Sequence, residues 1–290
     1  MVERFAHVLN VIAKDAAELA TELRGIGHAV WLSQGYAFDI PFTGEPGDVL
    51  ARARAASKEA AADINVVPAD RRRKKLLVAD MDSTIIGCEC LDEIAAMAGF
   101  GPRVAAITER AMRGEIAFEP ALRERVALMK GLPIATLERV YAERVRLNPG
   151  AKAVVATMRA HGAHCTLVSG GFTYFTRRVA MAAGFDAEFA NTLLDDGTTL
   201  TGLVGEPILG REAKTRTLEN AVAEYAIDFC DSLAVGDGAN DLDMIERAGL
   251  GVAYHAKPVV ANAAHATIAH GDLKGLLYLQ GYSEEEIRDA

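Results

Sequence analysis

The chain has 290 residues, of which 50% are hydrophobic and 24% are charged, which is typical of a globular protein with one large domain or two smaller ones. Its formal net charge of −9 argues against a nucleic-acid-binding protein that relies on a broad basic surface. No apolar stretch has the form of a signal peptide or the length of a membrane span, and the 4 cysteines suit a reducing compartment. We therefore expect a cytoplasmic protein that binds neither membrane nor nucleic acid.

The first 70 residues predict a small domain with the order strand, helix, strand, strand, helix, strand. The helical spacing lies at 15–27, with Asp15 as a candidate N-cap, and at 46–61. The segments with strand patterns are 5–13, 29–34, 36–42 and 63–68. This order is that of the ferredoxin-like α+β fold. It resembles the amino-acid-sensing ACT domains, although "AKDA" after the first strand lacks the glycine often found at an effector site.

The segment "PADRRRKK" at 68–75 is polar and begins with proline, which predicts a solvated linker. A second domain is expected over 74–290, beginning with the apolar strand "KKLLVAD" and continuing with a mostly helical tract at about 90–147. Helical and β-branched segments then alternate, which is typical of βαβ units and predicts an α/β fold with a doubly wound parallel sheet. The helical tract is an insertion that could cover the carboxyl ends of the strands, where such sheets bind ligands.

Three apolar strands run into small, polar or acidic residues. Their ends read "ADMDST" at 79–84, "LVSGGF" at 167–172 and "AVGDGAND" at 234–241. Each could be an ordinary turn, as we expect for Asp196 and Gly197 in "LLDDGTTL". The occurrence of all three in this order favours a shared site at one edge of the sheet.

The residues of these three segments, together with Lys214 in the helical pattern after "LGREA", suit phosphoryl transfer. Four carboxylates would converge there and need a cation, for which oxygen-rich sites favour Mg²⁺; they are Asp80, Asp82, Asp237 and Asp241. The hydroxyl of Ser169 and the N–H groups of Gly170 and Gly171 could cradle an anion, and Lys214 offers a positive charge. Other motifs fail on details, because the chain has no P-loop, no third glycine of a dinucleotide fingerprint and no glycine two residues before Ser169.

The combination of "DMDST", "SGG", a later lysine and "GDGAND" resembles the four motifs of the haloacid-dehalogenase-like phosphohydrolases over residues 74–290. The resemblance implies a Rossmann-like sheet with a helical cap inserted after the first strand. It also implies that Asp80 is the nucleophile and Asp82 the general acid and base. Mg²⁺ would be held by Asp80, the backbone carbonyl of Asp82 and Asp237, with Asp241 as a supporting acid.

Within that family the chain is most similar to the phosphoserine phosphatases. This implies hydrolysis of O-phosphoserine to serine and phosphate through an aspartyl-phosphate, the last step of serine biosynthesis. By position, Glu89 and Arg125 would bind the ammonium and carboxylate of the substrate. The other substrate contacts implied by the resemblance are Ser169, Gly170, Lys214 and Asn240 at the phosphoryl group, and Met112 and Phe118 in the apolar lining of the cap.

Several of these residues also have a purely structural explanation. Lys214 could lie on the surface, Glu89 could be a helix N-terminal charge, Arg125 could be solvated, and Met112 and Phe118 could be cap core. Two other functions stay open: a phosphotransferase that passes the phosphoryl group to another hydroxyl, such as that of homoserine, and a catalytically inactive amino-acid-binding regulator. A second copy of the chain, in a homodimer, is a further expected partner.

Overall fold

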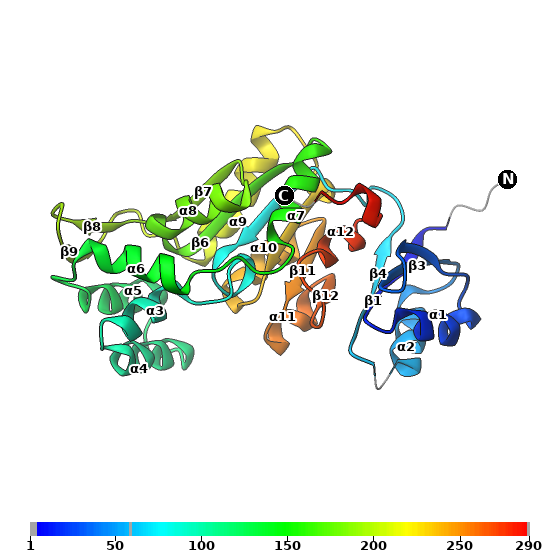
Figure 1. Cartoon of the computed structure of the whole chain (residues 1–290), viewed down its shortest axis with the longest axis horizontal. Helices are drawn as coiled ribbons and strands as arrows, with labels where there is room; N and C mark the ends of the chain where they lie inside the picture. Colours follow the sequence, from blue (N-terminus) through cyan, green and yellow to red (C-terminus); the bar gives the residue numbers. More distant parts are fainter. Residues whose placement is uncertain (1–4, 58–59, 289–290) are drawn as a thin grey trace.

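The structure, a computed structural model, describes residues 5–57 and 60–288. Its N-terminal part is a four-stranded antiparallel sheet in the order β2-β3-β1-β4 with two helices, which confirms the ferredoxin-like fold (Figure 1). The elements are β1 (His7–Ala13), α1 (Ala16–Glu22), β2 (Val30–Ser33), β3 (Ala37–Phe42), α2 (Pro46–Ala56) and β4 (Ala62–Pro68).

Two details of this sheet and its helices differ from expectation. Asp15 stands at the N-cap position of α1, but its side chain makes no capping hydrogen bond. The helix α2 ends at Ala56 instead of continuing to residue 61, and the expected continuation falls partly on residues 58–59, outside the described residues.

The larger part contains a six-stranded sheet in the order β12-β11-β10-β5-β6-β7, in which every pair is parallel. This confirms the doubly wound α/β fold. The strands are β5 (Leu76–Asp80), β6 (His164–Phe172), β7 (Ala187–Asn191), β10 (Ser232–Gly236), β11 (Leu250–Tyr254) and β12 (Ala266–Ile268). The flanking helices are α7 (Ala151–Ala160), α8 (Thr173–Ala183), α9 (Arg211–Glu224), α10 (Leu242–Arg247), α11 (Pro258–Ala263) and α12 (Gly275–Leu279).

Strand β5 shows why this sheet is buried on both faces. Leu77 and Ala79 belong to the large core that also contains residues of α7, α8 and α12. Leu76 and Val78 belong to a second core built with residues of α9 and α10. A parallel strand covered on both faces is therefore apolar at every position, as "LLVA" is. The edge strands β7 and β12 were not evident in the sequence, because β7 has mixed polarity and β12 has three residues.

The helical insertion forms a cap at the end of the molecule opposite the N-terminal sheet (Figure 1). It consists of α3 (Cys90–Met97), α4 (Gly101–Met112), α5 (Phe118–Ala127) and α6 (Ile134–Arg144). A hairpin of β8 (Leu193–Asp195) and β9 (Leu200–Val204) lies beside the cap. Its turn confirms the expectation for Asp196 and Gly197: the Asp196 carboxylate accepts the N–H groups of Thr198 and Thr199, and Gly197 has a φ of +92°.

The basic run at 71–75 links the two sheets and exposes Arg71, Arg73 and Lys75 as expected, but it is not a freely solvated linker, because its cations are held by acids and carbonyls of the fold. Arg71 donates to both carboxylate oxygens of Asp231, at 2.9 and 2.7 Å. Arg72 donates to both oxygens of Asp39 and to carbonyls at the end of α12. Lys74 is 8% exposed and donates to the carbonyls of Arg71 and Cys230. The cations of the run thus bind one acid of each part, Asp39 and Asp231, and carbonyls at the end of α12.

Strand β4 lies against β12, so the small sheet is attached along one edge of the large one. The Asn65 side chain donates to the Thr267 carbonyl and accepts its N–H, at 2.9 and 2.8 Å. The Asp63 carboxylate accepts the N–H groups of Ala269, His270 and Gly271. These polar contacts lie far from the cap. Among the described residues, none of the helices has the length and apolar character needed to cross a bilayer.

Candidate active site

The carboxyl ends of three adjacent strands, β10, β5 and β6, meet below the cap. A cavity of about 140 Å³ lies there. Its lining residues are Asp80, Asp82, Glu89, Leu91, Phe118, Leu122, Arg125, Ser169, Gly170, Gly171, Asp237 and Asn240. All three sequence motifs therefore contribute to one pocket, as expected for parallel strands that end at the same edge of a sheet.

Beneath the pocket, Lys214 joins two of the aspartates. Its Nζ lies 2.5 Å from Asp80 Oδ1 and 2.6 Å from Asp241 Oδ1, and the Lys214 side chain is 2% exposed. Lys214 is thus a buried partner of the carboxylates and not a surface lysine. Burial alone would lower the pKa of Lys214, but Asp241 and Asp80 raise it overall. Burial, followed by the nearby Asp241, raises the pKa of Asp80, and Lys214 opposes that rise.

A third carboxylate, that of Asp237, lies beside the two that Lys214 contacts. Asp80, Asp237 and Asp241 each offer an oxygen, and these atoms all lie within 4.8 Å of one another. Burial and the Asp241 carboxylate raise the pKa of Asp237. One lysine cannot neutralise three close carboxylates in a buried place, and a hard, oxygen-preferring divalent cation would. The cluster therefore fits Mg²⁺.

The side chain of Asp82 is not part of that cluster. The expectation that its carboxylate joins the other three around the cation therefore does not match the structure. Its Oδ1 accepts the N–H of Cys90 at 2.9 Å, and its Oδ2 accepts the hydroxyl of Ser169 at 3.1 Å. Burial, with a contribution from the nearby Glu89, raises the pKa of Asp82 to about 6. A carboxyl that changes protonation near neutrality suits proton transfer.

The turn after β5 carries Asp82 into the pocket, next to Asp80 at the end of the strand. Ser83 has a φ of +56°, in the left-handed region, and its hydroxyl donates to Glu89 Oε1 at 2.6 Å. The turn closes with a hydrogen bond from the Ile86 N–H to the Met81 carbonyl. Glu89 thus stands at the N-cap position of α3 with its carboxylate oriented by Ser83, and burial raises its pKa.

Residues 169–171, a bulged stretch inside β6 that we call the Ser169 loop, form the wall next to Asp82. Ser169 is 2% exposed, and its Oγ accepts the N–H of Gly171 at 2.8 Å. In this structure that N–H is therefore bound to Ser169 instead of facing an anion, whereas we expected it in the cradle. A Cβ at Gly171 would lie 2.9 Å from Asp82 Oδ2 and 3.0 Å from Ser169 Oγ, so any side chain here would displace one of these two groups. Helix α8 begins two residues later, at Thr173.

The cap contributes Arg125, a cation that makes no ion pair with a neighbouring carboxylate among the described residues. Arg125 on α5 lines the pocket, is half-buried, and returns its Nε to the Ala121 carbonyl at 3.2 Å. Within the described part of the chain, no carboxylate lies within 4.0 Å of its guanidinium nitrogens. Burial lowers the pKa of Arg125, and the more distant Asp92 and Glu89 oppose that change. A desolvated guanidinium of this kind is suited to an anionic ligand.

Most of the predicted site residues come together, with one exception. Met112, at the end of α4, is 71% exposed and does not line the pocket. Phe118 lines it, and its ring lies over the Gly170 backbone. Leu91 and Leu122 also line the pocket. Sequence reasoning missed these two because apolar cap residues at helical spacing look the same whether they face a core or a ligand.

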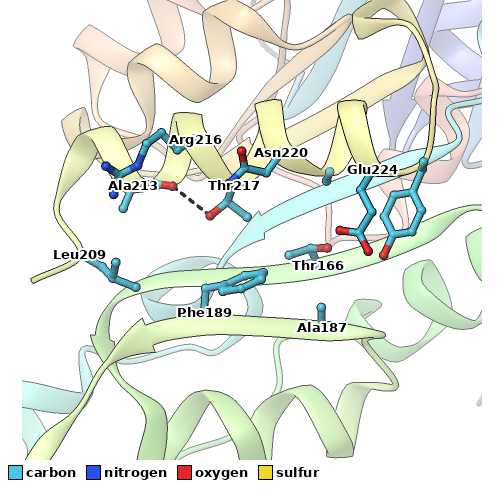
Figure 2. Close-up of a pocket in the computed structure, with 11 residues that line it drawn as sticks. Thr166, Ala187, Phe189, Leu209, Ala213, Arg216, Thr217, Asn220 and Glu224 are labelled. Carbon is cyan, nitrogen blue, oxygen red and sulfur yellow. Dashed lines mark hydrogen bonds between the residues drawn. The ribbon is translucent and has the colours of Figure 1, made fainter. Parts of the chain in front are cut away.

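A second cavity, of about 320 Å³, lies between α9 and the strands β6 and β7 (Figure 2). Thr166 and Phe189 line it from the strands, and Arg216 and Asn220 line it from the helix (Figure 2). None of its lining residues belongs to the three strand-end motifs. The converging acids therefore mark the smaller cavity under the cap as the active-site candidate.

Comparison with known proteins agrees with this geometry. The model of the haloacid dehalogenase-like hydrolase family matches residues 77–246. A phosphoserine phosphatase of Archaeoglobus fulgidus is 43% identical over 80% of this chain and 68% of its own length. One of Streptomyces coelicolor is 44% identical over 81% of this chain, which spans only 58% of that relative's length.

A solved structure, described as a probable phosphoserine phosphatase from Vibrio cholerae, superposes with a TM-score of 0.80 at 32% identity. That likeness covers 97% of this chain and 88% of the solved one. The family model covers more than half of the chain, and the relative from Archaeoglobus fulgidus is matched over two thirds of its own length. The chain therefore belongs to the haloacid dehalogenase-like hydrolases.

Proposed function

We propose that this hydrolase removes the phosphoryl group of O-phosphoserine, giving serine and inorganic phosphate. The observation that carries the proposal is the two-sided pocket. Acids, Ser169 and the buried Lys214 lie at the sheet edge, and the half-buried Arg125 faces the same cavity from the cap without a close acid. Phosphoserine has a phosphate at one end and a carboxylate with an ammonium at the other, which matches these two sides.

The first chemical step assigned here is attack of the Asp80 carboxylate on phosphorus. Lys214, 2.5 Å from one Asp80 oxygen, holds that carboxylate in place and offsets its charge. The bond from phosphorus to the serine oxygen breaks as the new bond forms, and the phosphoryl group is carried by Asp80. The leaving serine oxygen takes the proton of Asp82, whose position beside Ser169 keeps it at the pocket wall.

The second step reverses the role of Asp82. Its carboxylate, now ionised, takes a proton from a water molecule as the water oxygen attacks phosphorus. The bond between phosphorus and Asp80 breaks, inorganic phosphate leaves, and both aspartates return to their starting states. Ser169, the Gly170 backbone and Asn240, which line the phosphate side of the pocket, would contact the phosphoryl oxygens in both steps.

The carboxylates of Asp80, Asp237 and Asp241, with the backbone carbonyl of Asp82, are the groups that would hold Mg²⁺. When bound, the cation supplies positive charge that offsets the repulsion between carboxylates and phosphate.

Substrate choice is assigned to the cap. Arg125 would bind the substrate carboxylate with charge-assisted hydrogen bonds, and Glu89, held by Ser83, would bind the ammonium. Phe118 and the two lining leucines would exclude water from the apolar middle of the substrate. The names of the relatives, phosphoserine phosphatases from several organisms, support this choice. Met112 has no part in it, because its side chain is exposed outside the pocket.

A panel of phosphomonoesters assayed with Mg²⁺ tests the proposal, with O-phosphoserine, O-phosphothreonine, O-phosphoethanolamine and p-nitrophenyl phosphate as substrates. We expect the highest kcat/KM for phosphoserine. Addition of homoserine as an acceptor separates hydrolysis from phosphotransfer: hydrolysis gives inorganic phosphate in an amount equal to serine, whereas transfer gives phosphohomoserine. Absence of phosphate release from every ester would overturn the proposal and favour the regulatory alternative.

A further inference from the structure

We propose that Asn191, which lies outside the pocket, is a positioning residue for phosphoryl transfer. It fixes the Ser169 loop and the start of the Lys214 helix relative to each other. The inference rests on the proposed function only in requiring phosphomonoester hydrolysis, since Ser169 and Lys214, which these two elements carry, are assigned to the phosphoryl group and not to the rest of the substrate.

Asn191 is the last residue of β7 and is 1% exposed. Its Nδ2 donates to the Gly170 carbonyl at 2.9 Å and to the Leu209 carbonyl at 3.0 Å. Its Oδ1 accepts the Leu209 N–H at 2.7 Å. Both amide protons and the amide oxygen are therefore bonded to backbone, and the partners belong to two separate loops.

The first of these loops sits where the sheet itself gives no support. The pairing of β6 with β7 is regular up to Val168 opposite Phe189, and it resumes only at Phe172 opposite Asn191. Residues 169–171 of β6, the Ser169 loop, lie in this gap. The side chain of Asn191 supplies a hydrogen bond to Gly170 there, in place of the missing backbone ladder.

The second loop leads directly to Lys214. Leu209 precedes Gly210, which is the N-cap residue of α9, and Lys214 lies in the first turn of that helix. Figure 2 shows Leu209 beside the ends of β6 and β7, just before α9 begins. The two hydrogen bonds to Leu209 therefore set where α9 starts, and α9 in turn sets where Lys214 meets Asp80.

The same two loops carry the contact with the cap. A Cβ at Gly170 would lie 3.5 Å from Phe118 Cζ, and a Cβ at Gly210 would lie 3.2 Å from Phe118 Cδ1. The Phe118 ring thus rests on both glycine backbones that flank the Asn191 contacts. The buried Asn191 amide thus bonds both segments that the Phe118 ring contacts, the Ser169 loop and the residues before α9.

The test compares Asn191→Ala and Asn191→Asp with the wild-type protein, on phosphoserine and on p-nitrophenyl phosphate. Misplacement of reacting groups by about 1 Å costs on the order of 10²-fold in rate, so we expect kcat to fall by about tenfold or more, by the same factor on both esters. Aspartate keeps the volume of asparagine but turns an acceptor toward two carbonyl oxygens. We therefore expect Asn191→Asp to lose at least as much kcat as Asn191→Ala.

If Asn191 only filled space, Asn191→Asp should keep more kcat than Asn191→Ala, because aspartate fills that space and alanine does not. Asn65→Ala is the matched control, since Asn65 is equally buried and also bonds backbone twice, but at the junction of β4 and β12. It should lower the melting temperature and leave kcat of the folded protein within about twofold, as expected for a site distant from the chemistry. If Asn191→Asp keeps more kcat than Asn191→Ala, or if both keep wild-type kcat, the inference is overturned.

Should both Asn191 variants fail to fold, amide exchange in the wild-type protein decides. The Leu209 N–H is bound to Asn191, so inorganic phosphate in the active-site pocket should slow exchange of that N–H, although Leu209 does not line the active-site pocket. Exchange unaffected by saturating phosphate would contradict the coupling. A wild-type enzyme that hydrolyses p-nitrophenyl phosphate but not phosphoserine would overturn the proposed substrate alone and leave this test intact.

Discussion

Replacement of Arg125 by alanine removes the half-buried cation that the cap directs into the pocket. Its Nε is already bonded to the Ala121 carbonyl, so the N–H groups of the two terminal nitrogens remain for a ligand. A hydrogen bond to a charged group contributes about 1.5–3 kcal/mol. At about 1.4 kcal/mol for each factor of ten, kcat/KM for phosphoserine should fall by about 10- to 150-fold.

The assay compares phosphoserine with O-phosphoethanolamine, which keeps the phosphate and the ammonium but lacks the carboxylate. Arg125→Ala should change kcat/KM for phosphoethanolamine by less than about threefold, because that substrate has no carboxylate for the lost guanidinium to bind. The wild-type preference for phosphoserine should therefore nearly disappear.

Arg123→Ala is the matched control on the same helix. Arg123 pairs with Glu206 outside the pocket, and its side chain is 48% exposed. Exposed ion pairs contribute little, about 0–1 kcal/mol, so this variant should keep the wild-type preference. Equal losses on the two esters in Arg125→Ala would refute the assignment, because they would show that Arg125 supports the cap and does not bind the carboxylate.

Three further predictions concern the ion pairs and the cation. Arg72→Ala leaves the buried Asp39 carboxylate without its guanidinium and should lower the free energy of unfolding by about 3 kcal/mol in urea titrations, whereas Arg73→Ala, at an exposed pair, should cost less than about 1 kcal/mol. Arg71, with Lys75 nearby, lowers the pKa of Asp231 below its ordinary 3.8. The folded state is stabilised by this shift at every pH above that ordinary value, and the stabilisation is lost as pH falls toward the folded-state pKa. Asp231→Asn should therefore flatten the acid side of a plot of unfolding free energy against pH. Mg²⁺ should raise the melting temperature of the wild-type protein, EDTA should reverse the rise, and Asp237→Asn should abolish it; an equal rise in that variant would exclude Asp237 as a ligand.

Much of the site followed from the sequence, because strands of a parallel sheet end at a common edge. That rule alone placed Asp80, Ser169 and Asp237 in one pocket before their partners were known. Lys214 lies on α9 and not at a strand end, so its place in the site followed from the resemblance to the family, and its 2.5 Å contact with Asp80 supports that assignment.

Other features depend on partners that sequence patterns do not identify. The basic run looked like a solvated linker because its acids, Asp39 and Asp231, lie far away along the chain. Met112 and Phe118 have the same apolar character at helix ends, yet only Phe118 reaches the pocket. Asn191 carries no motif at all, and its importance appears only when the two loops that it bonds are seen together.

The central claim is that Asp80 carries the phosphoryl group of phosphoserine. The most direct measurement follows serine and phosphate release from O-phosphoserine with Mg²⁺, in the wild-type protein and in Asp80→Asn, with thermal melting to verify that both are folded. We expect equal amounts of serine and phosphate from the wild type and none above background from the folded variant, because the carboxylate is a reactant. Appreciable turnover by folded Asp80→Asn, or none by the wild type, would contradict the account.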